Sequence, residues 1–223
     1  MLRQIIALWK GERHMKKVVG EFGEMLSDTE YLFINAWEAL TGPAPIDKIP
    51  QPFYDRDIAV NSREREIRRM LVQHLSIYSK PDISGCLAMM SLVKDAERIG
   101  DYSKNIFELA VMLQGVVEGM KYLERLSSTQ RKIADRFPLL KMAFLESDER
   151  AAKKILKDYA PIKGECNTIL SDLLSEELPT REAVATSLLS RYLKRINSHM
   201  SNIGSGIIYP LDQIDFVRGG LLE

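Results

Sequence analysis

The chain has few cysteines, no long apolar run and no net charge, and each absence excludes a class of protein. Its 223 residues include only two cysteines, Cys86 and Cys166, which lie far apart in apolar segments. This usage is typical of reduced core thiols rather than of a disulfide framework. No segment approaches the ~20 consecutive apolar residues of a membrane-spanning helix, and the charged amino terminus lacks the features of a secretory signal. We therefore expect a cytoplasmic protein.

Charge and motif content exclude further functions. The 31 basic and 31 acidic residues cancel, so there is no global positive field to attract nucleic acid, and we expect no nucleic-acid partner. The sequence has no Gly-x-Ser-x-Gly element, no glycine-rich phosphate loop and no recognisable Cys–His arrangement, which disfavours nucleophilic catalysis and nucleotide hydrolysis. Hydrophobic residues make up 45% and charged residues 28% of the chain, as in ordinary globular proteins.

The pattern of apolar residues predicts an all-α fold. Apolar positions recur at helical spacing almost throughout, and no stretch alternates in the manner of a strand. The proline-rich segment 41–52 and the prolines Pro81 and Pro179 mark the turns between helices. Six long helices are expected, over residues 11–41, 53–78, 82–118, 121–146, 148–176 and 180–208.

The second half of the chain repeats the first. Residues 193–198 align with 96–101, and residues 201–203 align with 104–106. A repeat of about a hundred residues predicts two related units rather than a solenoid. We expect two tandem three-helix bundles, the first over residues 1–118 and the second over residues 119–223, which together form one compact domain.

Acidic side chains gather on the facing sides of two predicted helices. Glu97 and Asp101 are four residues apart, which places both on one helix face. If the helix is the second arm of an antiparallel hairpin that turns near residue 80, a polar stripe on the first arm lies at the same height, roughly 28 Å from the turn. The stripe consists of Asp57, Asn61 and Glu64.

Four carboxylates and an amide at one seam need compensating charge. Like charges held close together either take up protons or attract cations. Oxygen ligands suit Mg²⁺, Ca²⁺, Mn²⁺ or iron, and Zn²⁺ also accepts carboxylates. The alternative is an exposed face balanced by neighbouring basic residues, and spacing alone leaves both interpretations open. The available basic residues are Arg63, Arg65, Arg68, Lys94 and Arg98.

The same residues carry a family resemblance. Residues 95–106, centred on Glu97-Arg98-Ile99-Gly100-Asp101, resemble the signature of the PhoU family of phosphate-uptake regulators. Asp57-Ile58-Ala59-Val60-Asn61 with Glu64 resembles the family's partner motif, and residues 191–203 resemble its second copy. The likeness covers residues 15 to 210 and implies a cytoplasmic protein of two three-helix bundles. Proteins of this kind are negative regulators without catalytic activity that link a phosphate transporter to a membrane sensor kinase.

The resemblance also implies a ligand set and partners. Members carry iron or zinc clusters on acidic motifs, so a metal ion in the first bundle is expected, whether iron, zinc, manganese or magnesium. The implied partners are phosphate transporter components and the sensor kinase, and peripheral membrane association and a homodimer are compatible with the family. The predicted metal ligands are Asp57, Asn61, Glu64, Glu97 and Asp101.

The second half departs from the family pattern. Lys194 and Ser198 stand where the family has acidic residues, and Ile162 replaces the polar partner beside Asp158 and Glu165. A metal cluster is therefore expected only in the first bundle. Lys194 is predicted to pair with Asp158 or Glu165 in place of the missing cation.

Two other functions fit parts of the sequence. A metal-free helical adaptor, or the soluble domain of a phosphate cotransporter, accounts for the altered second repeat. A carboxylate-bridged metalloenzyme of the ferritin-like kind would use a Glu-x-x-His motif. The residue three past Glu97 is Gly100, which disfavours the enzyme.

Overall fold

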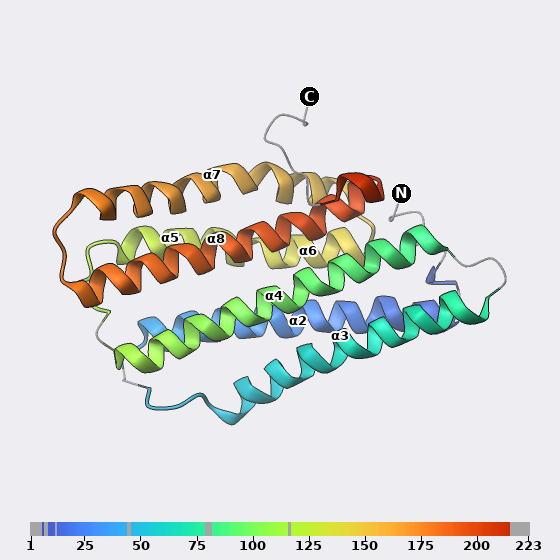
Figure 1. Ribbon diagram of the computed structural model, residues 1–223, viewed down its shortest axis with the longest axis horizontal. Helices are drawn as coiled ribbons and strands as arrows, with labels where there is room; N and C mark the ends of the chain where they lie inside the picture. Colours follow the sequence, from blue (N-terminus) through green and yellow to red (C-terminus); the bar gives the residue numbers. More distant parts are fainter. Residues whose placement is uncertain are drawn as a thin grey trace.

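The chain folds into two layers of long helices (Figure 1). The computed structural model describes residues 6, 9–11, 13–43, 46–78, 82–115 and 117–214, and these contain seven α-helices, one short 3-10 helix and no strand. The predicted all-α class is confirmed. The elements are α2 (Arg13–Thr41), α3 (Gln51–Ile77), α4 (Ile83–Leu113), α5 (Leu123–Ala134), α6 (Arg136–Leu145), α7 (Glu149–Ser175), α8 (Thr180–Ile208) and η1 (Leu211–Gln213).

The helices match the six predicted spans apart from two differences. The third span was predicted to reach residue 118, but α4 ends at Leu113 because Gln114 and Gly115 have positive φ angles of 50° and 79°, which end a helix. The fourth span is divided between α5 and α6 at Asp135. Pro138 explains the break, because its ring clashes with the carbonyl of Ala134 and it has no N–H to donate.

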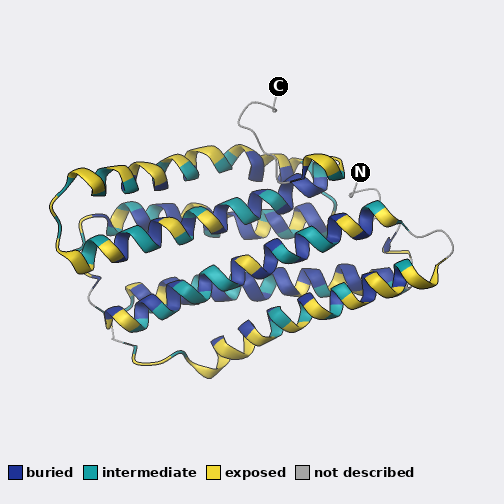
Figure 2. Cartoon of the chain, in the orientation of Figure 1, coloured by how far each residue is buried: buried dark blue, intermediate teal, exposed yellow. Residues whose placement is uncertain are grey.

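The helices form two three-helix bundles stacked against each other. The first bundle consists of α2, α3 and α4, and the second of α5 with α6, α7 and α8. Helices α4 and α8 pack together at the junction, as do α2 and α6, while α3 and α7 lie on the outer sides (Figure 1). Buried residues line the inward faces of the helices (Figure 2). No helix in the described ranges is long and apolar enough to cross a membrane.

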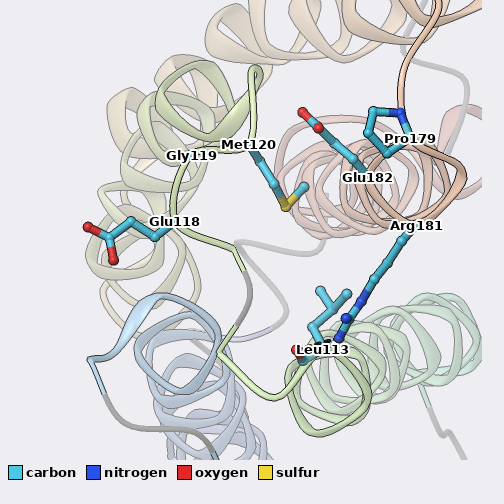
Figure 3. A pocket seen from close by; sticks show the side chains of 7 residues that line it. All are labelled: Leu113, Glu118, Gly119, Met120, Pro179, Arg181 and Glu182. Atoms are coloured by element: carbon cyan, nitrogen blue, oxygen red, sulfur yellow. Dashed lines mark hydrogen bonds between the residues drawn. The ribbon is translucent and has the colours of Figure 1, made fainter.

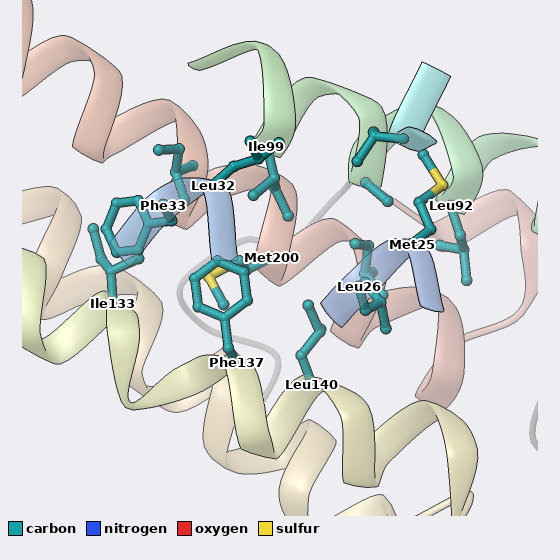
Figure 4. Packing of buried hydrophobic residues seen from close by; sticks show 14 of the residues in the cluster. Met25, Leu26, Leu32, Phe33, Leu92, Ile99, Ile133, Phe137, Leu140 and Met200 are labelled. Carbon is teal, nitrogen blue, oxygen red and sulfur yellow. The ribbon is translucent and has the colours of Figure 1, made fainter. Parts of the chain in front are cut away.

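Aromatic residues join the cores of the two bundles. The rings of Phe22 on α2 and Phe144 on α6 have centroids 4.4 Å apart, and those of Phe33 and Phe137 are 5.5 Å apart. All four side chains are fully buried. Figure 4 shows Phe33 and Phe137 beside Met200 of α8. The apolar core is therefore continuous across the boundary between the bundles.

The two cysteines belong to this interior. Both thiols are buried and free, in agreement with the sequence-based expectation. Burial raises the pKa of Cys86 and of Cys166 to about 11. Because the thiolate is the nucleophile and the metal ligand, these side chains are inert near neutral pH.

A buried polar cluster connects α4 and α8. Asp95 Oδ1 lies 2.7 Å from Nδ1 of His199 and accepts a hydrogen bond of 3.0 Å from Nδ2 of Asn202. The ring of Tyr102 stacks on His199 with centroids 5.8 Å apart. The side chains that make these contacts are buried or partly buried. The contacts fix the position of one bundle relative to the other.

We predict that His199→Ala lowers the free energy of unfolding by about 1–3 kcal/mol, because it removes a hydrogen bond to a buried carboxylate. Urea denaturation followed by circular dichroism measures the change. Arg191→Ala is the matched control, since Arg191 is exposed on the same helix. Equal stability of the two variants would contradict a structural role for the Asp95–His199 contact.

Candidate functional site

The hairpin of α3 and α4 brings the five predicted ligand residues to the same stretch of the two helices. A Cβ added at Gly100 would lie 3.3 Å from Cγ1 of Val60, so the two helices approach closely at this level. Contacts between Asp57 and Lys104 and between Glu64 and Lys94 join the helices on either side of it. The height deduced by counting residues from the turn is thus confirmed. We call Asp57, Asn61, Glu64, Glu97 and Asp101 the acidic seam.

The α3 carboxylates of the seam are buried and contact basic side chains. Asp57 Oδ2 accepts a 2.8 Å hydrogen bond from Nζ of Lys104, and this bond raises the pKa of Lys104. Glu64 Oε1 lies 2.9 Å from Nη2 of Arg68 and 3.8 Å from Nζ of Lys94. Burying these carboxylates without a cation would be unfavourable, so the basic partners account for their position.

The α4 carboxylates have basic partners on their own helix. Glu97 Oε2 accepts a hydrogen bond of 2.8 Å from Lys94 and lies 3.6 Å from Nε of Arg98. Asp101 Oδ2 accepts a hydrogen bond of 2.9 Å from Arg98. Burial, followed by the charge of Glu97, raises the pKa of Asp101. Glu97 and Asp101 therefore form the close acidic pair that their spacing predicts.

Asn61 is used within its own helix. Its amide nitrogen donates a hydrogen bond of 3.0 Å to the carbonyl oxygen of Asp57. The side chain is only partly buried. Of the five predicted ligands, Asn61 is the one whose observed contact is made with the backbone.

The donor atoms of the seam suit a hard or borderline cation, since all are carboxylate or amide oxygens. Glu64 Oε1 is buried and accepts no hydrogen bond, so its contact with Arg68 is purely electrostatic. Yet within the described ranges no group of three or more His, Cys, Asp or Glu side chains is arranged to hold a metal ion. The seam offers suitable donors, but its positive charge in this arrangement comes from lysine and arginine. The metal site stays a prediction.

The partner of Lys194 in the second bundle differs from the predicted one. Lys194 Nζ donates a hydrogen bond of 2.6 Å to Oδ1 of Asn167 and pairs with neither Asp158 nor Glu165, so that prediction is wrong. Asp158 instead pairs with Lys154, one turn away on the same helix, at 2.8 Å. Glu165 pairs with an arginine of α5 at 2.7 Å. Asp158 and Glu165 thus form ion pairs with basic residues other than Lys194.

An arginine that the sequence reading missed lies at the centre of the second bundle. Arg136 is 1% exposed and donates hydrogen bonds to the carbonyl oxygen of Ile155 at 2.7 Å, to Oγ of Ser201 at 2.9 Å and to Oδ1 of Asn197. Within the described ranges its partners are oxygen atoms of neutral groups rather than carboxylates, and burial lowers its pKa to about 10. Its place between Ile133 and Leu140 in an apolar stripe was the available signal.

A separate pocket of about 260 Å³ lies at the junction of the bundles, away from the seam (Figure 3). Arg181 extends from the start of α8 and donates a hydrogen bond of 2.7 Å to the carbonyl oxygen of Leu113 at the end of α4. Glu182 accepts a hydrogen bond of 2.7 Å from the backbone nitrogen of Lys121. These contacts tie the linker between the bundles to α8, and no seam residue lines the pocket.

Comparison with known proteins agrees with the fold and finds a family match in the first half of the chain. Residues 23–110, which include the whole seam, match the family model described as PhoU domain. The chain is 24% identical over 140 residues to a protein of Xylella fastidiosa called phosphate-specific transport system accessory protein PhoU homolog. This alignment covers 59% of the chain and 57% of the length of that relative.

Two solved structures share the arrangement of helices. The crystal structure of PhoU from Pseudomonas aeruginosa superposes with a TM-score of 0.69 at 21% identity, over 90% of this chain and 94% of that one. The phosphate transport system regulatory protein PhoU from Streptococcus pneumoniae superposes with a TM-score of 0.71 at 15% identity, over 100% of both chains. The resemblance is confirmed in two respects: residues 23–110 match the PhoU-domain model, and the described helices adopt the fold of the two PhoU structures.

Proposed function

We propose that this protein regulates phosphate transport by binding other proteins rather than by catalysing a reaction. The observation that carries the proposal is the PhoU-domain match over residues 23–110, which contains every residue of the acidic seam. The names of the relatives point the same way, one being a transport-system accessory protein and another a transport-system regulatory protein. Two stacked helical bundles offer long outer faces, on α3 and α7, for such binding (Figure 1).

The chemistry of the seam supports a non-catalytic role. Each of its carboxylates contacts a lysine or arginine, so none is placed as a free general base. The thiols of Cys86 and Cys166 are buried and protonated near neutral pH. The partners that we propose are components of a phosphate transporter and a membrane sensor kinase, bound at the cytoplasmic face of the membrane.

We also propose that the seam can take up a metal ion. Asp57, Glu64, Glu97 and Asp101 supply the donors, and an oxygen-ligated ion would neutralise their charge and could attract an oxyanion such as phosphate. A specific observation favours the alternative of a metal-free adaptor. Lys94 and Lys104 already provide positive charge to both ends of the seam.

The proposed regulation is tested in a bacterial strain that lacks its own PhoU protein. We predict that expression of this chain lowers phosphate uptake several-fold in phosphate-rich medium, and that Glu97→Ala/Asp101→Ala weakens the effect. The measurement is the initial rate of radiolabelled phosphate uptake at matched expression levels. Lys132→Ala is the control, since Lys132 is exposed on α5 and outside the seam. An uptake rate that is the same with and without the chain would refute the proposal.

A further inference from the structure

Lys94 lies between the two halves of the acidic seam. Its ammonium group is 2.8 Å from Oε2 of Glu97 on its own helix and 3.8 Å from Oε1 of Glu64 on α3. The side chain enters from solvent and is 40% exposed. Lys94 is therefore the basic residue that contacts carboxylates of both helices, and it can swing into water without disturbing the core.

The seam reaches charge balance without a metal ion. Its four carboxylates, on Asp57, Glu64, Glu97 and Asp101, face four basic side chains. A divalent cation bound between Glu64 and Glu97 would add two positive charges within a few ångström of the Lys94 ammonium. At such distances like charges repel strongly in a partly buried site. The four basic side chains are Arg68, Lys94, Arg98 and Lys104.

One carboxylate oxygen of the seam accepts no hydrogen bond and could instead coordinate a metal ion. Glu64 Oε1 is buried and accepts no hydrogen bond. It is also the atom nearest to the Lys94 ammonium across the hairpin. A metal at this position would satisfy an acceptor that the protein leaves without a hydrogen bond, in place of the ion pairs that Arg68 makes with it at 2.9 Å and Lys94 at 3.8 Å.

We infer that Lys94 is an internal cation that competes with a divalent metal ion for Glu64 and Glu97. The inference rests on the metal-binding part of the proposed function and adds its regulation. Metal uptake exchanges the ammonium for the ion, so the metal affinity of the wild-type protein is weak and its occupancy follows the free metal concentration. Among the described residues, no three acidic side chains are arranged around a metal position. This arrangement is then the form in which the Lys94 ammonium takes the place of the metal ion.

The test is a titration of Mn²⁺ into purified, metal-free protein, with bound metal measured by calorimetry and by the loss of the free Mn²⁺ signal in electron paramagnetic resonance. Lys94→Met removes the charge and keeps the length of the side chain. We expect it to bind Mn²⁺ at least ~10-fold more tightly than the wild type, since a positive charge beside the ligands is removed. Lys94→Arg keeps the charge and is expected to bind like the wild type.

The control is Lys154→Met, which makes the same change in the second bundle, where Lys154 pairs with Asp158 at 2.8 Å. It is expected to leave Mn²⁺ affinity unchanged. Adding Glu97→Gln to Lys94→Met is expected to abolish the gain, which would assign it to the seam. Circular dichroism verifies that each variant is folded.

Two outcomes overturn the inference and separate it from the proposals on which it rests. Equal affinity of wild type and Lys94→Met would show that Lys94 does not compete, and would leave the metal site itself standing. Absence of Mn²⁺ binding in every variant would remove both the competition and the metal site. Neither outcome changes the expected effect on phosphate uptake, which is measured in cells.

Discussion

Replacing Phe144 with alanine is expected to lower the free energy of unfolding by about 3–5 kcal/mol, the usual cost of removing a fully buried aromatic side chain. The ring is completely buried and packs against Phe22 at a centroid distance of 4.4 Å. Because Phe22 belongs to the first bundle and Phe144 to the second, the cavity opens between the bundles. Both bundles should lose stability together if they form one cooperative domain.

Two probes distinguish cooperative from separate unfolding in this variant. Fluorescence of the chain's two tryptophans, Trp37 on α2 and Trp9 just before that helix, which are both buried, reports on the first half of the chain, whereas circular dichroism reports on all helices. We expect both transitions in urea to shift together for Phe144→Ala and to stay in place for Met142→Ala, in which an exposed side chain of the same helix is removed. A fluorescence transition that does not move while the circular dichroism curve splits would contradict a shared core.

Arg136→Ala is expected to destabilise the protein by about 3–5 kcal/mol, because it combines a large cavity with the loss of several buried hydrogen bonds. Ile155, Asn197 and Ser201 would lose the donor that links α6 to α7 and α8. Arg136→Met fills more of the space and avoids a buried charge, so it should cost less than the alanine variant. Lys132→Ala, exposed one turn earlier, serves as the control.

The effect of Arg136→Ala should not depend on pH in the neutral range. Burial lowers the pKa of Arg136 to about 10, so the charged form is disfavoured in the folded state. The unfavourable contribution of this shift is fully present below the folded pKa and is relieved only as the pH rises above it. Between about pH 5 and pH 8 the guanidinium is charged in both states, so equal losses are expected. A loss below about 1 kcal/mol at either pH would contradict the role given to Arg136.

Much of the fold follows from local sequence signals. The period of the apolar residues gives the helices, and counting from the turn near residue 80 correctly places Asp57 and Glu64 level with Glu97 and Asp101. Pro138 was overlooked as the cause of the break between α5 and α6, although a proline inside a helix is a local signal. The internal repeat correctly indicates two bundles, because a three-helix unit of this length buries one apolar face and leaves another for its neighbour.

The side-chain partners within the seam could not be predicted in the same way. Sequence spacing fixes the height of a residue on a helix, but it does not fix the direction of long flexible side chains such as Lys94 and Arg68. Lys194 illustrates the point, since Asn167 lies within its reach and the carboxylates have other partners. Arg136 was missed because arginine is rarely buried without a carboxylate, and its acceptors come from helices distant in sequence.

Co-sedimentation with membranes is the sharpest test of whether the protein acts by binding to a phosphate transport system, as we propose. Purified chain would be mixed with membranes from its own source cells grown under phosphate limitation, and with membranes from cells that lack the phosphate transporter. We expect the chain to sediment with the first membranes and to stay in the supernatant with the second. Equal sedimentation with both, or with neither, would contradict it.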